Sequence, residues 1–304
     1  MAILSFWDNG FLLSESVIAR DYSGLADKIW NNKEEMTFSL EKEHMLLGFC
    51  VTANEPLTEL FQSPFWVVRF RFANVDTMHG EAQQDLLIQL FEALQTYMDE
   101  HKGYYNVRVP SHIVDAVKAY NSVLKEGFFC GGTIEELICG KTVKLEKRED
   151  LEVFWADASY IQKHKELLSQ MTFESFKSYQ GQYHISPITQ EKAGTIYENW
   201  IQTSLEQCDK NRVIVAEHDN RPIGFVTVVK AEAALEGVLS AVDDNYRKFG
   251  AYRAMISSIV NEAAKKGKAF ITSTQFDNYI VQGVWNSIGL KPYYSIYNIH
   301  IDKR

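Results

Sequence analysis

Apolar residues recur at helical spacing in the segment that follows Gly250. They lie at i, i+3, i+4, i+7, i+8 and i+11, at positions Tyr252, Met255, Ile256, Ile259, Val260 and Ala263. This spacing places them on one face of an α-helix. The short apolar segments "EGVLSAV" before this helix and "AFITSTQ" after it have the length and composition of strands. The pattern therefore predicts a strand, a helix and a second strand between residues 236 and 275.

The same order of elements occurs in both halves of the chain. The first half has the strand-like segments "PFWVVRFRF" and "YYNVRVP", which the amphipathic segment "EAQQDLLIQLFEALQTYMDEH" separates. A helical segment at 112–125 and the strand-like "TIEELIC" follow them. The second half continues from "AFITSTQ" into a helical segment after Asn278 and a final strand-like "SIYNIHI". The chain therefore predicts two similar units of α/β or α+β type, each a sheet that carries helices.

Charged and turn-forming residues mark the connections between these elements. The segment "GKTVKLEKREDLE", at 140–152, is a charged linker, and we expect one domain over 1–145 and a second over 146–304. Ahead of the second repeat, "PITQEKAGTIYENWIQTSLEQ" predicts a helix that starts at Pro187. The "DNRP" within "RVIVAEHDNRPIGFVTVVKA" predicts the turn of a hairpin.

Composition and charge indicate a globular chain without a general affinity for nucleic acid. The 304 residues are 46% hydrophobic and 13% aromatic, which is enough for substantial cores. With a net charge of −9 and a pI near 5.5, the chain can hold an anionic ligand only through a local basic cluster. No signal-peptide pattern and no run of about 18 apolar residues occur, so neither secretion nor contact with a membrane is expected. The four cysteines lack CxxC spacing, which favours a cytoplasmic location.

A basic turn is the strongest chemical signal in the sequence. In "SAVDDNYRKFGAYRAM", Arg247, Lys248, Gly250 and Arg253 surround the change from strand to helix. The N–H groups and the positive dipole end of a helix start favour a phosphate or pyrophosphate. Glycine also permits a close approach of the ligand to the backbone. The alternative interpretation is a glycine-containing turn with solvated basic side chains.

Other chemical motifs are not present. The segment "CGKT" ends like a P-loop, but Glu135 stands where that motif requires its first glycine. The eight histidines show no HExxH or paired ligand spacing, and no Gly-x-Ser-x-Gly motif occurs. We therefore expect neither a metal site nor a serine hydrolase.

The basic turn, the order of elements and the segment "TQFDNYIVQGVWNSIGL" resemble the GCN5-related N-acetyltransferase (GNAT) superfamily. Its cofactor loop has the pattern Q/R-x-x-G-x-G/A, in which Arg247 fills the first position and Gly250 the fourth, while Tyr252 replaces the usual Gly or Ala. The resemblance implies the acyl-CoA N-acyltransferase fold, a mixed and largely antiparallel sheet flanked by helices, in two tandem domains. The segments "YQGQYHISPITQEKAGTIYENWIQTSLEQ" and "FWDNGF" are similar to TDP-fucosamine acetyltransferase-like members.

This resemblance implies acetyl-CoA as co-substrate and assigns residues to it. The implied contacts are Ala241, Val242, Arg247, Lys248, Phe249, Gly250, Ala251, Tyr252, Arg253, Asn278 and Trp285. The backbone N–H of Ala241 or Val242 would polarise the thioester carbonyl. Asn278 would bond the cofactor, and a helix cap alone is its alternative role. Trp285 falls where many members carry a tyrosine that protonates the departing thiolate, a task that an indole N–H cannot perform.

Proton transfer therefore needs other groups. An alkyl amine must lose a proton before or during acyl transfer. Glu236 matches the position of the glutamate base of some members, and His184 precedes the helix that covers the acceptor site in this fold. Tyr297, together with Tyr293 and Tyr294, is a candidate proton donor. A solvated or structural role is the alternative for each of these residues.

The first half lacks the cofactor loop, because "NVDTMHGEAQ" has no Arg or Gln before a Gly-x-Gly/Ala pair; His79 and Gly80 occupy the equivalent turn. We interpret it as a degenerate repeat that supports the active domain or recognises the acceptor. The resemblance implies an N-acetyltransferase that acts on a primary amine of a small molecule, such as a nucleotide-linked amino sugar. A CoA-binding module without turnover and an interaction protein are the alternatives. The oligomeric state stays open, with a homodimer as one option.

Overall fold

The computed structural model describes residues 36–42, 45–73, 81–111, 113–145, 148–177, 179–206, 211–231 and 234–304. The segment "FWDNGF" and the residues His79, Gly80 and Cys208 lie outside the described residues. The chain forms two compact units. Unit 1 contains Met1–Ile134, Gly181–Gln190 and Tyr293–Arg304, and unit 2 contains Glu135–Gln180 and Glu191–Pro292.

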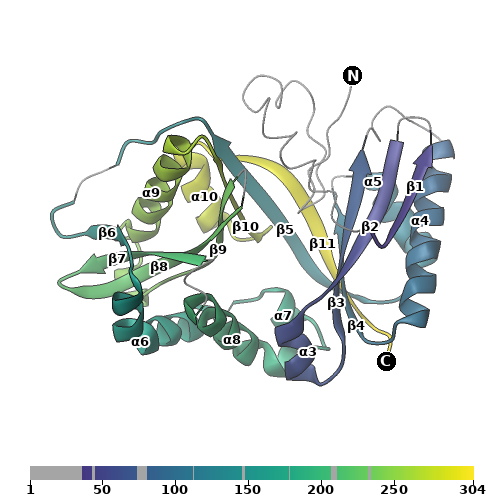
Figure 1. Ribbon diagram of the computed structural model, residues 1–304, viewed down its shortest axis with the longest axis horizontal. Helices are drawn as coiled ribbons and strands as arrows, with labels where there is room; N and C mark the ends of the chain where they lie inside the picture. The colour runs from purple at the N-terminus through teal and green to yellow at the C-terminus, as the bar shows by residue number, and fades with distance from the viewer. Residues whose placement is uncertain are drawn as a thin grey trace. The chain divides into compact units, whose positions relative to one another are not determined.

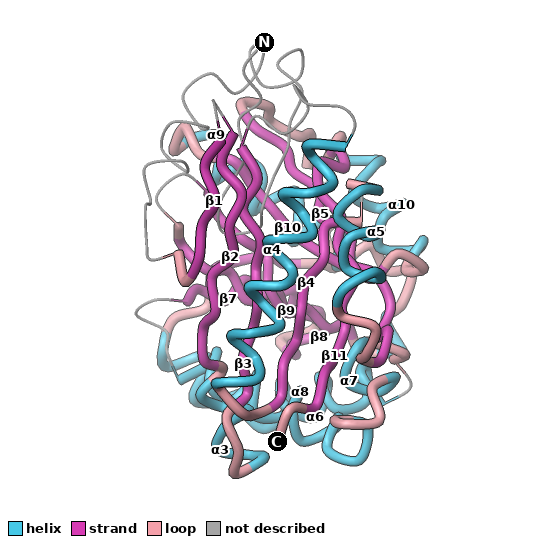
Figure 2. Tube along the Cα trace, turned by 90° about the vertical axis from the view of Figure 1, so that its right-hand side faces the viewer, coloured by secondary structure: helices cyan, strands magenta, loops and turns pink. Residues whose placement is uncertain are grey.

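Unit 1 is a sheet with the helices α4 and α5 packed on one face. Its elements are β1 (Phe38–Lys42), β2 (Met45–Ala53), α3 (Glu55–Phe61), β3 (Phe65–Ala73), α4 (Glu81–Glu100), β4 (Tyr104–Pro110), α5 (Val114–Val123), the first part of β5 (Phe128–Cys139), α7 (Gln182–Ile185) and most of β11 (Lys291–Asp302). The pairs β1–β2 and β2–β3 are antiparallel, β3–β4 is parallel, and β4–β11 is antiparallel. Helix α4 lies along these strands (Figure 2), because Leu87, Leu90, Phe91 and Leu94 form an apolar face that is fully buried.

Unit 2 has helices on both faces of its sheet. Its remaining elements are β6 (Glu152–Trp155), α6 (Ala158–Lys177), α8 (Ala193–Glu206), β7 (Asn211–His218), β8 (Arg221–Lys230), β9 (Ala234–Val242), α9 (Ala251–Lys265), β10 (Ala269–Gln275) and α10 (Tyr279–Ile288). The strand order is β5-β10-β9-β8-β7-β6. Helix α9 packs on one face and α6 on the other (Figure 1). The apolar positions of α9 predicted from the sequence lie in this core, except that Tyr252 is only half-buried.

The two long strands β5 and β11 are each divided between the units. Strand β11, the last strand of the second repeat, pairs with β4 of the first, from Ile296 opposite Pro110 to Asp302 opposite Tyr104. Strand β5, the last strand of the first repeat, neighbours β10 of the second. The predicted domain boundary between residues 145 and 146 stays a prediction. Each compact unit contains segments from both sides of this boundary. If the two predicted repeats are compared, the final strand of each therefore pairs with a strand of the other, which we call the strand exchange.

Several local predictions can be compared with the structure. The predicted fold class, a mixed and largely antiparallel sheet flanked by helices, is confirmed. The hairpin turn is also confirmed, with Asp219 and Asn220 at φ 49° and 60° between β7 and β8. The predicted helix start at Pro187 is wrong, since α8 begins at Ala193. Residues 187–189 form a turn in which Thr189 Oγ1 donates to the Tyr183 carbonyl at 2.8 Å, and a 3-10 helix, Gln190–Lys192, leads into α8.

Candidate functional site

A tight turn in unit 2 joins β9 to α9. Asp243 Oδ1 accepts hydrogen bonds from the backbone N and the Nδ2 of Asn245, both at 3.0 Å, and so caps the 3-10 turn Asp244–Tyr246. Lys248 and Gly250 then adopt φ of 71° and 84°, which glycine tolerates better than other residues. A Cβ on Gly250 would meet no atom within 4 Å. The backbone angle therefore favours glycine here, and packing within the protein does not require it.

The first turn of α9 presents backbone donors. No side chain caps the helix at Gly250. The first intrahelical bond runs from Ala254 N to Gly250 O at 3.0 Å, so the N–H groups of Ala251, Tyr252 and Arg253 have no acceptor within the helix. Together with the positive end of the helix dipole, these donors favour an anionic ligand.

Basic side chains lie around this helix start, as the sequence predicts. Arg247 and Lys248 are exposed. Arg247 forms an ion pair with Asp244 at 2.6 Å, and Arg253 Nη1 donates to Ser287 Oγ at 3.0 Å. These contacts are on the surface of unit 2, where a ligand phosphate could replace the acceptors.

Arg148 also belongs to this turn, which no sequence pattern indicated. Its guanidinium lies 4.0 Å from the ring centroid of Phe249 and donates to the Phe249 carbonyl at 2.7 Å. Arg148 also forms an ion pair with Asp150 at 2.8 Å. Because Arg148 is part of the charged linker, the local pattern suggested only a solvated residue. It adds a further positive charge beside the predicted cofactor loop.

The parallel strands β9 and β10 separate next to the turn. They pair over four positions and stop at Gly237 opposite Thr272. Strand β9 continues for residues 238–242 and β10 for residues 273–275, and these two segments are not paired with each other. The register of β9 against β8 also shifts beside Val228, which marks a bulge. An opening between the two strands follows, with the basic turn at its end.

Backbone hydrogen bonds show which way the amides of β9 point. Asp243 N donates to a β8 carbonyl at 2.9 Å, and Leu239 N donates to a β8 threonine hydroxyl at 3.1 Å. Because N–H directions alternate along a strand, the N–H of Ala241 also points to β8. The N–H groups of Ser240 and Val242 point away from β8, toward the opening. This geometry favours Val242 over Ala241 as a donor to a ligand in the opening.

Trp285 lies in the core of unit 2. Its side chain is 1% exposed, and its Nε1 donates to the hydroxyl of Tyr252 at 2.9 Å. Burial raises the pKa of Tyr252 to about 12, although hydrogen bonds with Trp285 and Ser240 act in the opposite direction. Trp285 therefore positions the hydroxyl of Tyr252 beside Ser240 and has little surface of its own to offer a ligand.

Asn278 is the N-cap of α10, and it is half-buried. Its Oδ1 accepts a hydrogen bond from Val281 N at 3.4 Å, and its Nδ2 donates to Thr274 Oγ1 at 2.9 Å. The capping role is therefore present in the structure. The same asparagine stands at the end of β10, beside the separated strands.

The three predicted catalytic residues are divided between the units. Glu236 is half-buried on β9, opposite Val229 on one side. Its neighbour Leu235 packs in the core below α9, so Glu236 points to the face that α6 covers. His184 and Tyr297 belong to unit 1. Burial lowers the pKa of His184.

Tyr297 packs as a hydrophobic residue in unit 1. Its ring lies edge-on to Phe129, with centroids 5.2 Å apart, and the side chain packs against the core of that unit. On the same strand, Tyr294 is buried and Tyr293 is half-buried. Tyr297 therefore packs as an ordinary aromatic residue of its strand. This is the structural role that the sequence left as the alternative.

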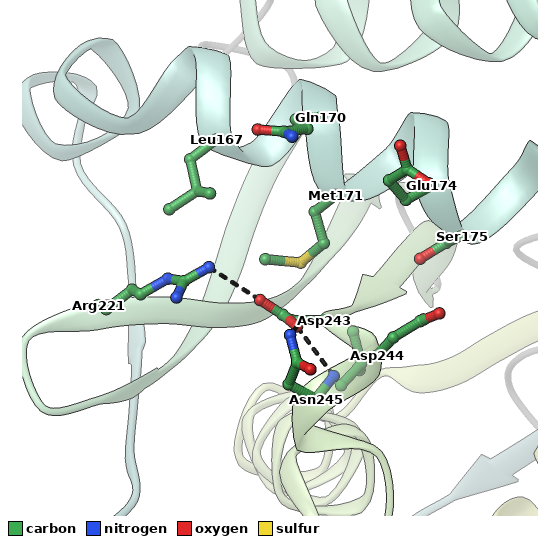
Figure 3. A pocket seen from close by; sticks show the side chains of 10 residues that line it. Leu167, Gln170, Met171, Glu174, Ser175, Arg221, Asp243, Asp244 and Asn245 are labelled. Carbon is green, nitrogen blue, oxygen red and sulfur yellow. Dashed lines mark hydrogen bonds and ion pairs between the residues drawn. The ribbon is translucent and has the colours of Figure 1, made fainter.

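A cavity of about 280 Å³ lies between α6 and the turn after β9 (Figure 3). Helix α6 supplies apolar and polar side chains to it, and the opposite wall comes from Arg221 and residues 242–245. Asp243 Oδ2 accepts a hydrogen bond from Arg221 Nη2 at 3.0 Å. Glu174, Asp243 and Asp244 make the lining acidic overall. The α6 residues could not be identified from the sequence because their spacing is that of an ordinary amphipathic helix.

Glu136, an acidic residue that the sequence pattern did not indicate, lies in the core of unit 2. Glu136 of β5 is 1% exposed, and its Oε2 has no hydrogen-bond partner. Burial raises the pKa of Glu136 to about 7, while the charge of Lys291 acts to lower it. Its charge in turn raises the pKa of Tyr252. The strand exchange therefore places a carboxyl group of the first repeat next to the tyrosine of the second.

The described part of the chain is predicted from the sequence to have neither a membrane-spanning helix nor a metal site. No helix there has the length and apolar character needed to cross a membrane. No group of three or more His, Cys, Asp or Glu side chains in the same residues could hold a metal ion.

A protein-family model matches part of this chain. Residues 173–290 match the model of the Acetyltransferase (GNAT) family. Among curated proteins, none matches this chain.

Solved structures match this chain at low identity, and those with a TM-score above 0.5 share its fold. A GCN5-related N-acetyltransferase from Sphaerobacter thermophilus is 8% identical, with 92% of this chain and 86% of that chain covered and a TM-score of 0.56. A functionally unknown conserved protein from Staphylococcus epidermidis is 12% identical, with 90% and 97% covered and a TM-score of 0.53. A tandem GNAT protein from the clavulanic acid biosynthesis pathway is 10% identical, with 86% and 79% covered and a TM-score of 0.47. The narrower likeness to TDP-fucosamine acetyltransferase-like proteins is not confirmed and stays a prediction.

Proposed function

We propose that this chain transfers an acetyl group from acetyl-CoA to a primary amine of a small molecule, and the match of residues 173–290 to the Acetyltransferase (GNAT) family model supports this proposal. The observation that carries the proposal is the opening between β9 and β10, which starts after Gly237 and ends at the uncapped start of α9. A thioester in the opening would have its phosphates at the helix start. No other part of unit 2 combines an opening in the sheet with backbone donors for phosphate in the described residues.

The phosphates of acetyl-CoA would be held by the first turn of α9 and by the basic side chains around it. The N–H groups of residues 251–253 supply the donors, and Arg247 and Lys248 supply positive charge. The Val242 N–H would donate to the thioester oxygen, where negative charge grows as the amine attacks. Asn278 would contact the cofactor from the end of β10.

The acceptor amine would enter from the α6 side. The cavity of about 280 Å³ is lined by Glu174, Asp243 and Asp244, and it reaches Val242 at the end of β9. Carboxylates attract an alkyl ammonium group. Glu236 points to the same face and is our proposed base. It lies six residues before Val242 on β9, about 20 Å along the strand, so it would take the first proton through bound water before the amine attacks. The amine then bonds to the carbonyl carbon, the C–S bond breaks, and the second proton of the nitrogen passes through water to the departing thiolate, which leaves as the CoA thiol.

We propose Tyr252, in place of Tyr297, as the group that assists the departing thiolate. The Tyr252 hydroxyl is oriented by the Trp285 indole and lies beside Ser240. A pKa of about 12 is above the value of about 8.5 for an ordinary thiol. Complete proton transfer to the thiolate would thus be unfavourable, and the tyrosine would act as a hydrogen-bond donor.

Thiol release from acetyl-CoA tests this function. A panel of primary amines and amino sugars, including a nucleotide-linked amino sugar, is assayed for amine-dependent release of CoA. Calorimetry with acetyl-CoA is run in parallel. We expect binding and release with at least one amine. Binding without release would favour a CoA-binding module, and no binding would favour an interaction protein. A cytoplasmic location and a homodimer stay predictions.

A further inference from the structure

Unit 1 carries polar residues on the sheet face opposite α4 and α5. On β4, Tyr105, Val107 and Val109 belong to the core beneath these helices, so Asn106 and Arg108 point to the other face. On β11, Ile299 and Ile301 belong to the same core, so Asn298 and His300 also point away from it. The strand register places Asn106 opposite His300 and Arg108 opposite Asn298. The result is a polar cluster in the middle of a sheet.

Two arginines lie side by side at one end of this cluster. Arg69 of β3 is the Cα partner of Arg108, at the last paired position of the two parallel strands. The Arg69 Nη1 donates to Thr52 Oγ1 at 3.0 Å. Arg108 is half-buried, and its Nε is buried without a hydrogen-bond partner. No carboxylate in the described part of the chain forms an ion pair with Arg108.

His300 lies next to these arginines and is fully buried. Both of its ring nitrogens lack a hydrogen-bond partner. Burial lowers the pKa of His300 to about 3, and the charge of Arg108 acts in the same direction. The ring is therefore neutral and has one donor and one acceptor to offer.

Asn106 completes the set of unsatisfied groups. Its side chain is 1% exposed; the Nδ2 donates to Gln182 Oε1 at 2.9 Å, and the Oδ1 has no partner. The segment with Gln182 also brings Tyr183, which is buried, interacts electrostatically with Arg69 and Arg108, and has its ring centroid 6.1 Å from that of His300. Three adjacent residues thus hold unpartnered polar atoms under one covering segment.

Buried polar atoms are paired in nearly all native proteins, so a group of them requires a partner that is not part of the chain. Water could satisfy the dipoles of Asn106 and His300, whereas an anion would also pair with the charge of Arg108. A planar carboxylate matches the fork of donors on a guanidinium. A donor on the same molecule, such as an amine or hydroxyl, would match the free Asn106 Oδ1.

We propose that unit 1 has a binding site for a small carboxylate, formed by Arg108, His300 and Asn106 with Arg69 beside them. The site is independent of the acetyl transfer proposed for unit 2, since all four residues belong to unit 1. It gives the first repeat a ligand of its own, although that repeat lacks a cofactor loop.

Calorimetry and thermal unfolding of the full chain test the site with alanine, glutamate and succinate as probes. Their amides serve as uncharged controls, and inorganic phosphate as a different anion. At least one carboxylate should release heat and raise the melting temperature, while its amide should not. Arg108→Gln should weaken that binding by tenfold or more. Arg304→Gln, which removes an exposed arginine of the same unit, should leave it unchanged.

Asn106→Asp keeps the test valid if Arg108→Gln does not fold. It places a carboxylate of the chain itself next to Arg108, so it should raise the melting temperature without ligand and abolish binding of the added carboxylate. No binding of any probe carboxylate would overturn the proposal, as would equal binding by wild type and both cluster variants. Binding of phosphate in preference to every carboxylate would also overturn it.

Discussion

Glu136 allows a quantitative test of the packing of unit 2. Its side chain is 1% exposed, on the same strand face as Ile138 of the core. Burial raises its pKa from the ordinary 4.5 to about 7. Between these values the folded chain holds a proton that the unfolded chain has lost. The free energy of unfolding must therefore fall as the pH rises from about 4.5 to about 7.

The size of this loss follows from the difference between the two pKa values. At 1.36 kcal/mol for each pH unit, a rise from 4.5 to about 7 corresponds to about 3 kcal/mol. Glu136→Gln keeps the shape of the side chain and removes the titration. Relative to wild type, the variant should gain about 3 kcal/mol between pH 4.5 and pH 8.

Urea unfolding at pH 4.5, 6 and 8 measures this difference, with tryptophan fluorescence as the signal because Trp285 lies in the same core. Glu149→Gln is the control, since Glu149 is an exposed carboxyl in the linker. Its stability should follow that of wild type at each pH. Parallel curves for wild type and Glu136→Gln over the whole pH range would show that Glu136 ionises normally, and the buried position would then be wrong.

Three further predictions concern the proposed reaction. Gly250→Val should weaken acetyl-CoA binding about 5- to 150-fold in calorimetry, because valine strains the positive φ and displaces a backbone donor from the phosphate; unchanged affinity would make the turn an ordinary one. Glu236→Gln should lower kcat/KM by on the order of 10²-fold or more without changing acetyl-CoA affinity, and the loss should shrink as pH rises and free amine accumulates; wild-type rates across pH would remove Glu236 from the mechanism. Tyr252→Phe should lower kcat more than it raises KM in steady-state assays, whereas a structural role alone would show as a lower melting temperature with unchanged kcat.

The sequence predicted those parts of the fold that depend on local pattern. The apolar spacing after Gly250 predicted α9, and the "DNRP" turn predicted the hairpin of β7 and β8. The strand exchange was not predictable in this way, since the period of two in β5 and β11 specifies which face is buried and does not specify the neighbouring strand. Only long-range pairing decides that β11 lies next to β4.

For the candidate site, the sequence indicated the positions of residues along the chain but not which of them are buried. Residues 247–250 lie in the turn before α9, residues 251–253 are the first residues of that helix, and Asn278 caps α10; their contact with a cofactor stays a prediction. Trp285 was expected at a ligand and is a core residue, because a single position in a pattern carries no information on burial. Glu136 was missed because a glutamate in a strand is ordinarily exposed, whereas the consecutive residues Glu135 and Glu136, on opposite faces of β5, are both buried.

The exchange of final strands also determines when each unit can be completed during protein synthesis. Strand β4 is made early, but its neighbour β11 (Lys291–Asp302) is made much later. The edge of β4 must therefore remain without this partner until β11 has been synthesised, and an unpaired edge is a template for aggregation. A truncation just before β11 would damage the unit that was synthesised first and leave most of the later one intact.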